Sequence, residues 1–214
     1  ILDIGCGKSF LPLYYLYRGS QVWVVDNGEF YSDFDKFYRQ ILDSRLFLDG
    51  DRMNIIWGNF QDIDFPVNHF DLITAVSTLE HLKLGADMNA VMKISSLLKK
   101  GGSCIISLPF SQSGTKERFL SNNNGFYFQR DYELNCVYKR IIEPSGLHLK
   151  YFYIIGERFP LLGKKIFFGK LLSRYRNLWT KLLAGFFWKI YYKGSDLKVP
   201  QFKYPGVIIV ILEK

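Results

Sequence analysis

Seven short apolar runs rich in β-branched residues recur along this chain, and the segments between the first five are each long enough for a helix. The runs span residues 1–4, 21–25, 54–57, 70–76, 103–108, 147–155 and 206–212. Strands that alternate with helices form a mainly parallel sheet with helices on both faces. Ligands of such sheets bind at the C-terminal edge, where the strand order reverses. The pattern therefore predicts an α/β fold with its site at that edge.

The helices of this fold are predicted from hydrophobic periodicity and from stop signals. They cover residues 11–18, 30–47, 86–98 and 131–143. A glycine pair at 101–102 ends the third helix and leads into the fifth strand. A chain of 214 residues and 25.0 kDa fits a single domain over residues 1–214. Because the first residue is Ile and lies within a strand pattern, we expect that the N-terminal start of the protein precedes it.

Composition argues against several classes of protein. Hydrophobic residues make up 48% and charged residues 22%, which is ordinary for a folded domain and argues against long disordered stretches. Cys6, Cys104 and Cys136 follow neither a disulfide nor a zinc-ligand spacing, so we expect a reducing, cytoplasmic setting and no metal site. The longest uncharged apolar run near the C-terminus, residues 182–188, is far shorter than the roughly 20 residues that span a bilayer.

Residues 158–200 interrupt the alternation of strands and helices and are predicted to be a helical insertion before the last strand. Eleven of the 28 Lys and Arg residues lie between residues 157 and 203, together with two of the 20 acids. Within the insertion, residues 166–192 have helical spacing with an apolar and a basic face. Docking on its own domain is the commonest role of such a helix. A lid over the site and a peripheral contact with an anionic membrane are the alternatives.

The first strand runs into a glycine turn, ILDIGCGKSF, which lets a ligand approach the backbone. Asp3 stands just before the turn, and an acid there suits a cationic ligand better than a pyrophosphate. Ser9 occupies the position of a third glycine, and the spacing differs from that of a phosphate-binding loop. Asp26, at the end of the second strand, lies at about the ~20-residue distance from which an acid binds ribose hydroxyls. Taken alone, Asp26 is more typical of a helix N-cap or a turn.

Several segments together resemble the class I S-adenosylmethionine-dependent methyltransferases. ILDIGCGKS resembles the first motif, VVDN the ribose acid, GNFQDIDFP the adenine loop, FDLITAVSTLEHL the fourth strand with its loop, and LLKKGGSCIISLP the fifth strand. LHLKYFYIIGE and GVIIVILEK resemble the closing antiparallel hairpin of that family. The resemblance implies a Rossmann-like, seven-stranded, mainly parallel sheet with an antiparallel last strand. It also implies S-adenosyl-L-methionine as the cofactor and a small or lipid-linked molecule as the methyl acceptor.

Carried over residue by residue, the resemblance implies which groups hold the cofactor. Gly5, Cys6 and Gly7 would present their backbone to it. Asp3 would support the methionine end, in part through water. Asp26 would bind the ribose hydroxyls.

The resemblance also assigns the adenine and the sulfonium ends of the cofactor. Asn27 would flank the adenine, and Phe60 would pack on the ring or offer its N–H. Asn59 stands where many relatives have an acid, and its side-chain carbonyl would accept from the adenine amino group. Val76 and Ser77 would line the methionine amine and the sulfonium. Ser9 and Asn59 depart from the family pattern, which keeps open a non-catalytic relative that retains the fold.

Methyl transfer from a sulfonium requires a positioned nucleophile and, for a hydroxyl, removal of its proton. His81, directly after the fourth strand, is the candidate base, because histidine titrates near neutrality. A purely structural role in its loop is the alternative. Tyr127, Phe128 and Arg130, in a polar loop over residues 111–130, are candidates for contacts with the acceptor.

Three other functions are alternatives to that of an O- or N-methyltransferase. The sequence STLEHL after the fourth strand differs from the motif of enzymes that methylate exocyclic amines of bases, so a nucleic-acid substrate is disfavoured despite the net charge of +8. The lack of a full G-x-G-x-x-G disfavours a nicotinamide-dependent oxidoreductase. A non-catalytic protein that binds the membrane surface through residues 158–200 is the third. The oligomeric state is not predicted.

Overall fold

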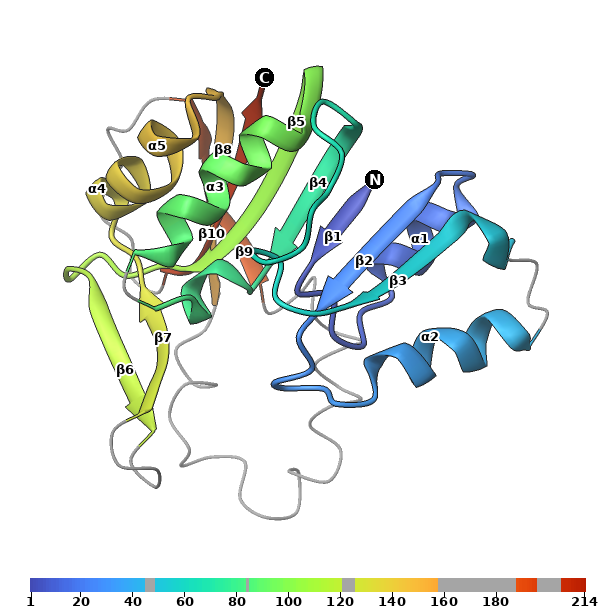
Figure 1. The fold of residues 1–214 in the computed structure, drawn as a ribbon. Helices are drawn as coiled ribbons and strands as arrows, with labels where there is room; N and C mark the ends of the chain where they lie inside the picture. Colours follow the sequence, from blue (N-terminus) through green and yellow to red (C-terminus); the bar gives the residue numbers. More distant parts are fainter. Residues whose placement is uncertain (45–48, 84, 121–125, 158–187, 196–204) are drawn as a thin grey trace.

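A central sheet of eight strands organises the part of the chain that the structure describes (Figure 1). The structure is a computed structural model, and it describes all residues except 45–48, 84, 121–125, 158–187 and 196–204. The strand order is β3-β2-β1-β4-β5-β10-β8-β9. The strands of this sheet are β1 Leu2–Ile4, β2 Val22–Asp26, β3 Met53–Trp57, β4 Phe70–Val76, β5 Leu98–Pro109, β8 His148–Glu157, β9 Trp188–Gly194 and β10 Pro205–Glu213.

The first five strands are parallel to one another, as the alternation of strands and helices predicts. β1 lies between β2 and β4, with Asp3 opposite Val24 on one side and Thr74 on the other. The chain adds β3 outside β2 and then returns to add β4 and β5 on the far side of β1. The strand order therefore reverses beside β1, and the C-terminal ends of β1, β2 and β4 meet at the edge where such sheets bind ligands.

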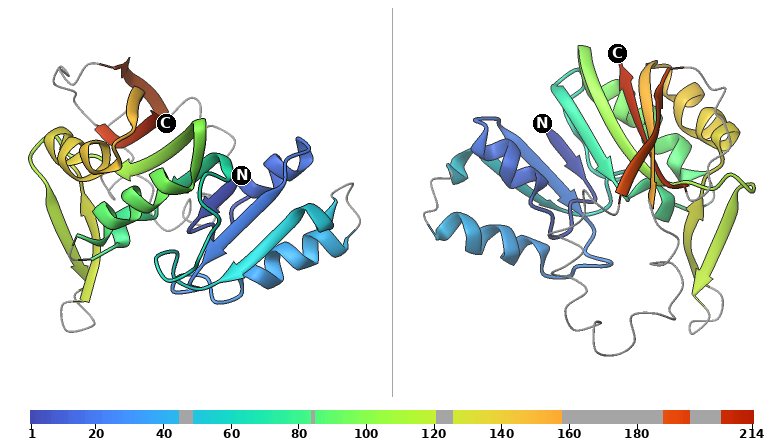
Figure 2. Two further views of the ribbon diagram at one scale, coloured as in Figure 1. Left: turned by 45° about the horizontal axis from the view of Figure 1, so that its top comes forward. Right: turned by 180° about the vertical axis from the view of Figure 1, so that it is seen from behind.

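Helices cover both faces of the sheet, and each face has its own apolar core. α1 Leu11–Tyr17 and α2 Phe34–Asp43 bury Leu16 and Tyr38 in one cluster. α3 Ala86–Leu97 packs on the other face, where Ile94 belongs to the larger cluster. α1 lies behind the sheet in Figure 1 and in front of it when the molecule is turned, whereas α3 changes places the opposite way (Figure 2).

The C-terminal half of the sheet is antiparallel. β10 lies between β5 and β8 and is antiparallel to both, and β9 pairs with the outer edge of β8. The predicted α/β fold with an antiparallel last strand is thus confirmed. The sheet has eight strands in place of the predicted seven, because residues 188–194 form β9. The helical pattern predicted over 166–192 is therefore wrong at its C-terminal end, and its remainder lies outside the described residues.

Two helix predictions need adjustment. The second helix is shorter than predicted, because α2 begins only after residues 30–33 have formed a loop and a turn. The fourth consists of α4 Leu134–Val137, the π-helical turn η3 Tyr138–Ile142 and α5 Glu143–Ser145. Two short 3-10 turns, η1 Gly50–Arg52 and η2 Leu79–His81, precede β3 and follow β4.

The polar segment predicted as a loop over 111–130 contains a two-stranded antiparallel hairpin. β6 Lys116–Leu120 pairs with β7 Phe126–Asp131, and the hairpin extends away from the central sheet (Figure 1). The sequence prediction failed here because the side chains of β6 are exposed, so no alternation of apolar and polar residues marks the strand. Among the described residues, no helix is both long and apolar enough to cross a membrane.

Candidate functional site

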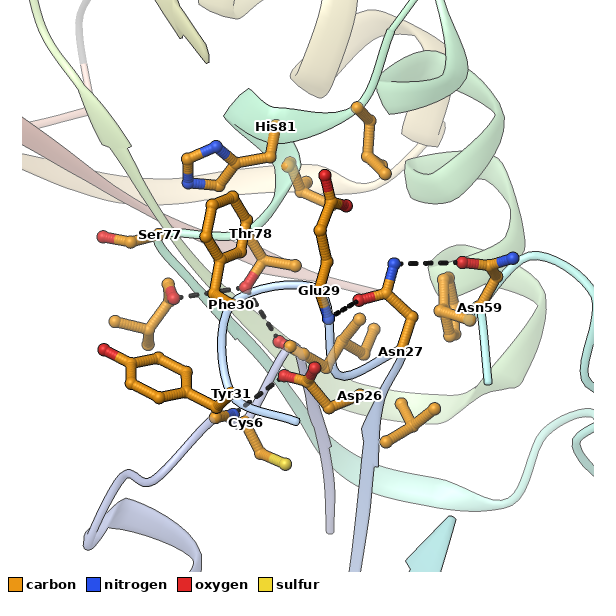
Figure 3. Close-up of a pocket in the computed structure, with 18 of the residues that line it drawn as sticks. Cys6, Asp26, Asn27, Glu29, Phe30, Tyr31, Asn59, Ser77, Thr78 and His81 are labelled. Atoms are coloured by element: carbon orange, nitrogen blue, oxygen red, sulfur yellow. Dashed lines mark hydrogen bonds between the residues drawn. The ribbon is translucent and has the colours of Figure 1, made fainter. Parts of the chain in front are cut away.

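A cavity of about 530 Å³ opens at the C-terminal edge of β1, β2 and β4. Its volume lies within the range of pockets that bind small molecules and cofactors. Ten of the eleven predicted site residues line it: Gly5, Cys6, Gly7, Asp26, Asn27, Asn59, Phe60, Val76, Ser77 and His81. Figure 3 shows several of these side chains converging from β2, from the loop after β3 and from the turn after β4.

The turn after β1 has glycine at two positions where a side chain would collide with a neighbouring residue. Gly5 and Gly7 have φ angles of +66° and +47°, which side chains rarely adopt. A Cβ on Gly5 would collide with the Thr78 side chain, and one on Gly7 would lie 2.8 Å from the Tyr31 ring. The Gly5 N–H donates to the carbonyl of Val25 at 2.8 Å, which fixes the turn against β2. These contacts explain why the turn requires glycine at both positions.

Asp26 organises the backbone on both sides of the cavity. Its carboxylate accepts from the Gly7 N–H at 2.9 Å and from the Gly28 N–H at 2.7 Å. Each carboxylate oxygen has more than one acceptor site, so capacity for a ligand hydroxyl remains. Asp26 therefore acts as a turn residue, the simpler interpretation of the sequence, and still faces the cavity.

Two amides span the cavity beside Asp26. The Asn27 side-chain N–H donates to the Asn59 side-chain oxygen at 3.1 Å, and the Asn27 oxygen accepts from the Glu29 N–H at 3.0 Å. The Asn59 N–H in turn donates to Asp62 at 3.0 Å. The chain of amides ties the loop after β2 to the loop after β3 (Figure 3).

Lys93 of α3 shapes the loop after β3, a role that the sequence did not indicate. Its ammonium donates to the carbonyls of Phe60, Gln61 and Ile63 at 2.8, 3.0 and 2.6 Å. It also lies 5.0 Å from the centre of the Phe60 ring, which suits a cation–π contact. Desolvation lowers the pKa of Lys93 from its usual value. Phe60 is buried and lines the cavity, so this lysine fixes part of the cavity wall.

The end of β4 carries a strained residue. Ser77 has a φ of +51°, and its N–H donates to the Ser107 hydroxyl of β5 at 3.0 Å. Thr78 follows and donates its hydroxyl to the Ile4 carbonyl at 3.0 Å, which ties this turn to β1. Strained backbone of this kind is concentrated at functional sites. Val76 and Ser77 both line the cavity here.

His81 lies at the far side of the cavity, among aromatic rings. Its Nδ1 is 2.6 Å from the Phe128 carbonyl oxygen of β7. Its ring centre is 4.8 Å from that of Phe30 and 5.3 Å from that of Phe128. Because a carbonyl only accepts, the hydrogen bond assigns the Nδ1–H form to the neutral imidazole.

Two buried carboxyl groups, those of Asp3 and Glu80, lie next in sequence to residues that line the cavity. Asp3 is the predicted residue that does not line the cavity: it is 3% exposed and accepts a hydrogen bond from the Thr74 hydroxyl. Desolvation raises the pKa of Asp3 to about 7. Glu80 is 2% exposed, and its Oε2 has no hydrogen-bond partner among the described residues. Desolvation raises the pKa of Glu80 to about 8, so this carboxyl is mostly neutral at pH 7.

The predicted acceptor contacts divide between two places. Phe128 lines the cavity. Tyr127 donates its hydroxyl to the Glu80 carbonyl at 2.7 Å, and Arg130 is buried in an ion pair with Asp87 at 3.0 Å. Of the three, only Phe128 is thus among the residues that line the cavity.

Several cavity residues had no sequence signal. Glu29, Phe30, Tyr31 and Thr78 line the cavity beside the predicted set. Their loops follow strands at the expected edge, but only the folded chain brings Phe30 against His81.

The hydroxyl of Ser9 accepts from the Leu11 N–H at 3.1 Å, so it helps to begin α1. Within the described residues, no group of three or more His, Cys, Asp or Glu side chains is arranged to hold a metal ion.

A doubly wound sheet with a cavity at its switch point is the architecture of Rossmann-like proteins, a class in which nucleotide-sized ligands bind at this edge. Residues 2–106 match the family model described as a methyltransferase domain. The match covers just under half of the chain, and it confirms the resemblance to class I S-adenosylmethionine-dependent methyltransferases. None of the curated proteins with which the sequence was compared matches it.

Solved structures of methyltransferases share the fold. A SAM-dependent methyltransferase from Methanosarcina mazei has a TM-score of 0.63 at 12% identity, over 100% of this chain and 91% of that one. The 1,6-didemethyltoxoflavin-N1-methyltransferase of Burkholderia thailandensis was solved with 1,6-didemethyltoxoflavin and S-adenosylhomocysteine. It has a TM-score of 0.60 at 15% identity, over 100% of this chain and 69% of that one. An O-methyltransferase of a Brevibacillus brevis multienzyme was solved with S-adenosylhomocysteine. It has a TM-score of 0.56 at 15% identity, over 100% of this chain and 65% of that one.

Proposed function

We propose that this protein is an S-adenosylmethionine-dependent methyltransferase that methylates an oxygen or nitrogen of a small or lipid-linked acceptor. One observation carries the proposal: the glycine turn, the acid at the end of β2, the amides beside it and a histidine line a single cavity at the switch point. The neighbours solved with S-adenosylhomocysteine support the choice of cofactor, and they include both an N- and an O-methyltransferase.

The residues present suit this cofactor. Asp26 and Glu29 contribute acidic groups to the cavity wall, whereas Lys8, a cation of the wall, is paired with Asp33 at 2.6 Å. An acidic wall suits a ligand that carries ammonium and sulfonium charges. Gly5 and Gly7 have positive φ angles and carry no side chain, so a ligand can approach the backbone of the turn closely.

The proposed roles follow the arrangement of the cavity. Asp26 binds the ribose hydroxyls, Asn27 and Asn59 flank the adenine, and Phe60 packs against its ring. The backbone of Gly5, Cys6 and Gly7, with Asp3 beneath it, supports the methionine end, and Val76 and Ser77 line the sulfonium. The Cys6 thiol itself is buried, and burial raises its pKa far above the usual range, so its contribution is steric.

In the mechanism that we propose, the chain positions the acceptor and accepts its proton. The bound cofactor supplies a methyl group on an electron-poor sulfonium. The glycine turn and β4 hold the donor end, and the aromatic rings around His81 exclude water from the acceptor side. His81 acts as the general base when the acceptor is a hydroxyl. Methyl transfer then depends mainly on orientation.

Calorimetry with S-adenosylhomocysteine tests the proposal directly. We expect saturable one-site binding, and we expect NADH to give no heat under the same conditions. If NADH binds in place of S-adenosylhomocysteine, the protein is an oxidoreductase on a similar sheet. If neither compound binds, the proposed function is wrong.

We also propose that residues 1–214 form one methyltransferase domain, in which the part of the predicted insertion that precedes β9, residues 158–187, contributes to the cover of the acceptor. A peripheral membrane contact through this basic segment remains a prediction. Flotation with anionic liposomes tests it, using a variant in which residues 158–187 are replaced by a short Gly/Ser linker. We expect flotation to be lost in that variant, and unchanged flotation would exclude the segment as the anchor.

A further inference from the structure

The hairpin strand β7 touches η2 at two consecutive residues. The Phe128 carbonyl lies 2.6 Å from His81 Nδ1, and the Tyr127 hydroxyl donates to the Glu80 carbonyl at 2.7 Å. The first bond fixes the side chain of His81, and the second fixes the backbone just before it. Both the ring and the main chain of His81 are therefore held by the hairpin.

The hairpin itself is anchored by buried charges. Arg130, 4% exposed, donates to Asp87 at 3.0 Å and to Glu117 of β6 at 2.8 Å. Asp87 lies in the first turn of α3 and also accepts from Arg140 and Tyr132. Buried ion pairs of this kind hold one geometry, because any displacement leaves an unpaired charge. The position of β7 relative to the turn after β4 is thereby fixed.

We propose that the β6–β7 hairpin is a positioning element for His81, and that it prepares this residue for an acceptor hydroxyl. The proposal rests on the proposed methyltransferase function. With hydrogen on Nδ1, the neutral ring has its lone pair on Nε2. Nε2 has no hydrogen-bond partner among the described residues. The hairpin thus supplies a base in one tautomer rather than a mixture of two.

A base of this kind is required by a hydroxyl and not by an amine that is already neutral. A neutral amine already carries the lone pair that attacks a methyl group, whereas a hydroxyl becomes an effective nucleophile only as it loses its proton. In the balanced step, the O–H proton moves to Nε2 and the oxygen forms the new O–C bond. The C–S bond breaks, and its electron pair remains on sulfur, which becomes a neutral thioether.

The surroundings of His81 indicate the skeleton that carries this hydroxyl. Phe30 and Phe128 lie against the imidazole, and their ring centres are 6.2 Å apart. Phe30 is 53% exposed, so one side of its ring remains available to a ligand. Aromatic walls favour planar or apolar partners. The acceptor class is therefore a hydroxyl compound with an aromatic or apolar body, such as a phenol.

Nitrogen-15 NMR of the imidazoles tests the tautomer without knowledge of the natural acceptor. The chain has only three histidines, so His69, His81 and His148 can be assigned by single substitutions. At a pH where the ring is neutral, we expect His81 to carry hydrogen on Nδ1. In Tyr127→Phe, we expect the tautomer equilibrium to move towards Nε2–H by roughly two- to ten-fold, the factor that corresponds to one net hydrogen bond. Tyr17→Phe, on the exposed side of α1, is the matched control and leaves the equilibrium unchanged.

A second measurement tests the hydroxyl. Phenol and toluene are added in turn to the protein saturated with S-adenosylhomocysteine, and the Nε2 resonance of His81 is followed. We expect phenol to shift it and toluene to leave it near its starting position. An Nε2–H tautomer in the wild type overturns the positioning role, and equal responses to phenol and toluene overturn the hydroxyl assignment. Failure of S-adenosylhomocysteine to bind would instead contradict the proposed function, because the tautomer is measured independently.

Discussion

At the scale of single residues, the site depends on groups that serve the fold and the ligand together. Asp26 ends β2, bonds the backbone of Gly7 and Gly28 and faces the cavity. Ser77 follows β4 with a left-handed backbone that β5 holds through Ser107. Because these residues serve both the fold and the ligand, a substitution alters both roles, and a control variant elsewhere in the chain is needed to separate them.

Replacing Asp26 by Ala removes the proposed ribose contact. A hydrogen bond to a charged group contributes roughly 1.5–3 kcal/mol, so we expect S-adenosylhomocysteine to bind about 10- to 100-fold more weakly by calorimetry. Asp71→Ala, which removes an exposed carboxylate paired with Lys99 at 2.9 Å, is the control and leaves the affinity unchanged. Unchanged affinity in Asp26→Ala would place the ribose elsewhere.

Gly5→Ala tests the steric argument for the turn. The added methyl group meets the side chain of Thr78, which cannot yield easily because its hydroxyl is bonded to the Ile4 carbonyl. We expect loss of cofactor binding and a clear drop in the melting temperature. Gly101→Ala is the control, because Gly101 has a φ of +77° but open space around it, so it carries only the backbone cost of about 1–2 kcal/mol. Equal effects of the two variants would show that the contact with Thr78 is unimportant.

At the scale of elements, η2 joins a buried carboxyl to the histidine of the site. Glu80 has a folded pKa of about 8 against an ordinary value of 4.5, because burial disfavours its charged form. Its neutral form contributes stability that is fully present below pH 4.5 and is lost as the pH rises through 8.

We therefore expect wild-type protein to lose melting temperature between about pH 5 and 8 more steeply than Glu80→Gln, which keeps the shape of the side chain and does not titrate. Thermal unfolding at a series of pH values measures this. Asp3, with its pKa raised to about 7, contributes in the same direction in both proteins and cancels in the difference. Parallel curves would mean that Glu80 is ionised in the folded state.

The hairpin is attached to α3 through Asp87, which is fully buried and accepts from Arg130, Tyr132 and Arg140. Asp87→Ala removes the carboxylate that Arg130 and Arg140 share, and we expect a loss of about 3–5 kcal/mol in the free energy of unfolding, measured with urea. Glu213→Ala, which breaks the exposed pair with Lys150, is expected to cost about 1 kcal/mol or less. Similar losses would show that burial adds little to the Asp87 network.

Sequence reasoning succeeded for elements with strong local signals and failed where distant residues decide the structure. The apolar runs and the alternation of strands and helices predicted the parallel sheet, and the resemblance to class I methyltransferases supplied ten residues that line one cavity. β6 escaped detection because all of its side chains are exposed. Lys93 and Phe30 were missed because their roles depend on loops about thirty and about fifty residues away along the chain.

At the scale of the whole molecule, β10 joins the two halves of the sheet. Ile208 is fully buried in the strand that pairs with both β5 and β8. Ile208→Ala leaves a cavity between the halves, at a cost of about 2–5 kcal/mol. By hydrogen exchange, we expect the amides of β5 and β8 to lose protection together. Ile209→Ala, at a half-buried position, is the control, and loosening of β8 alone would show that the halves are independent.

The place of β10 also constrains how the protein is made. A ribosome releases β8 before β10, yet the sheet order puts β10 between β5 and β8. The edge of β5 and the edge of β8 thus stay unpaired until β10 has been synthesised. Closing the sheet then joins strands that are far apart in the sequence, which is a slow step in folding. Nascent chains of this protein are therefore expected to need protection of these open strand edges until β10 pairs with both of them.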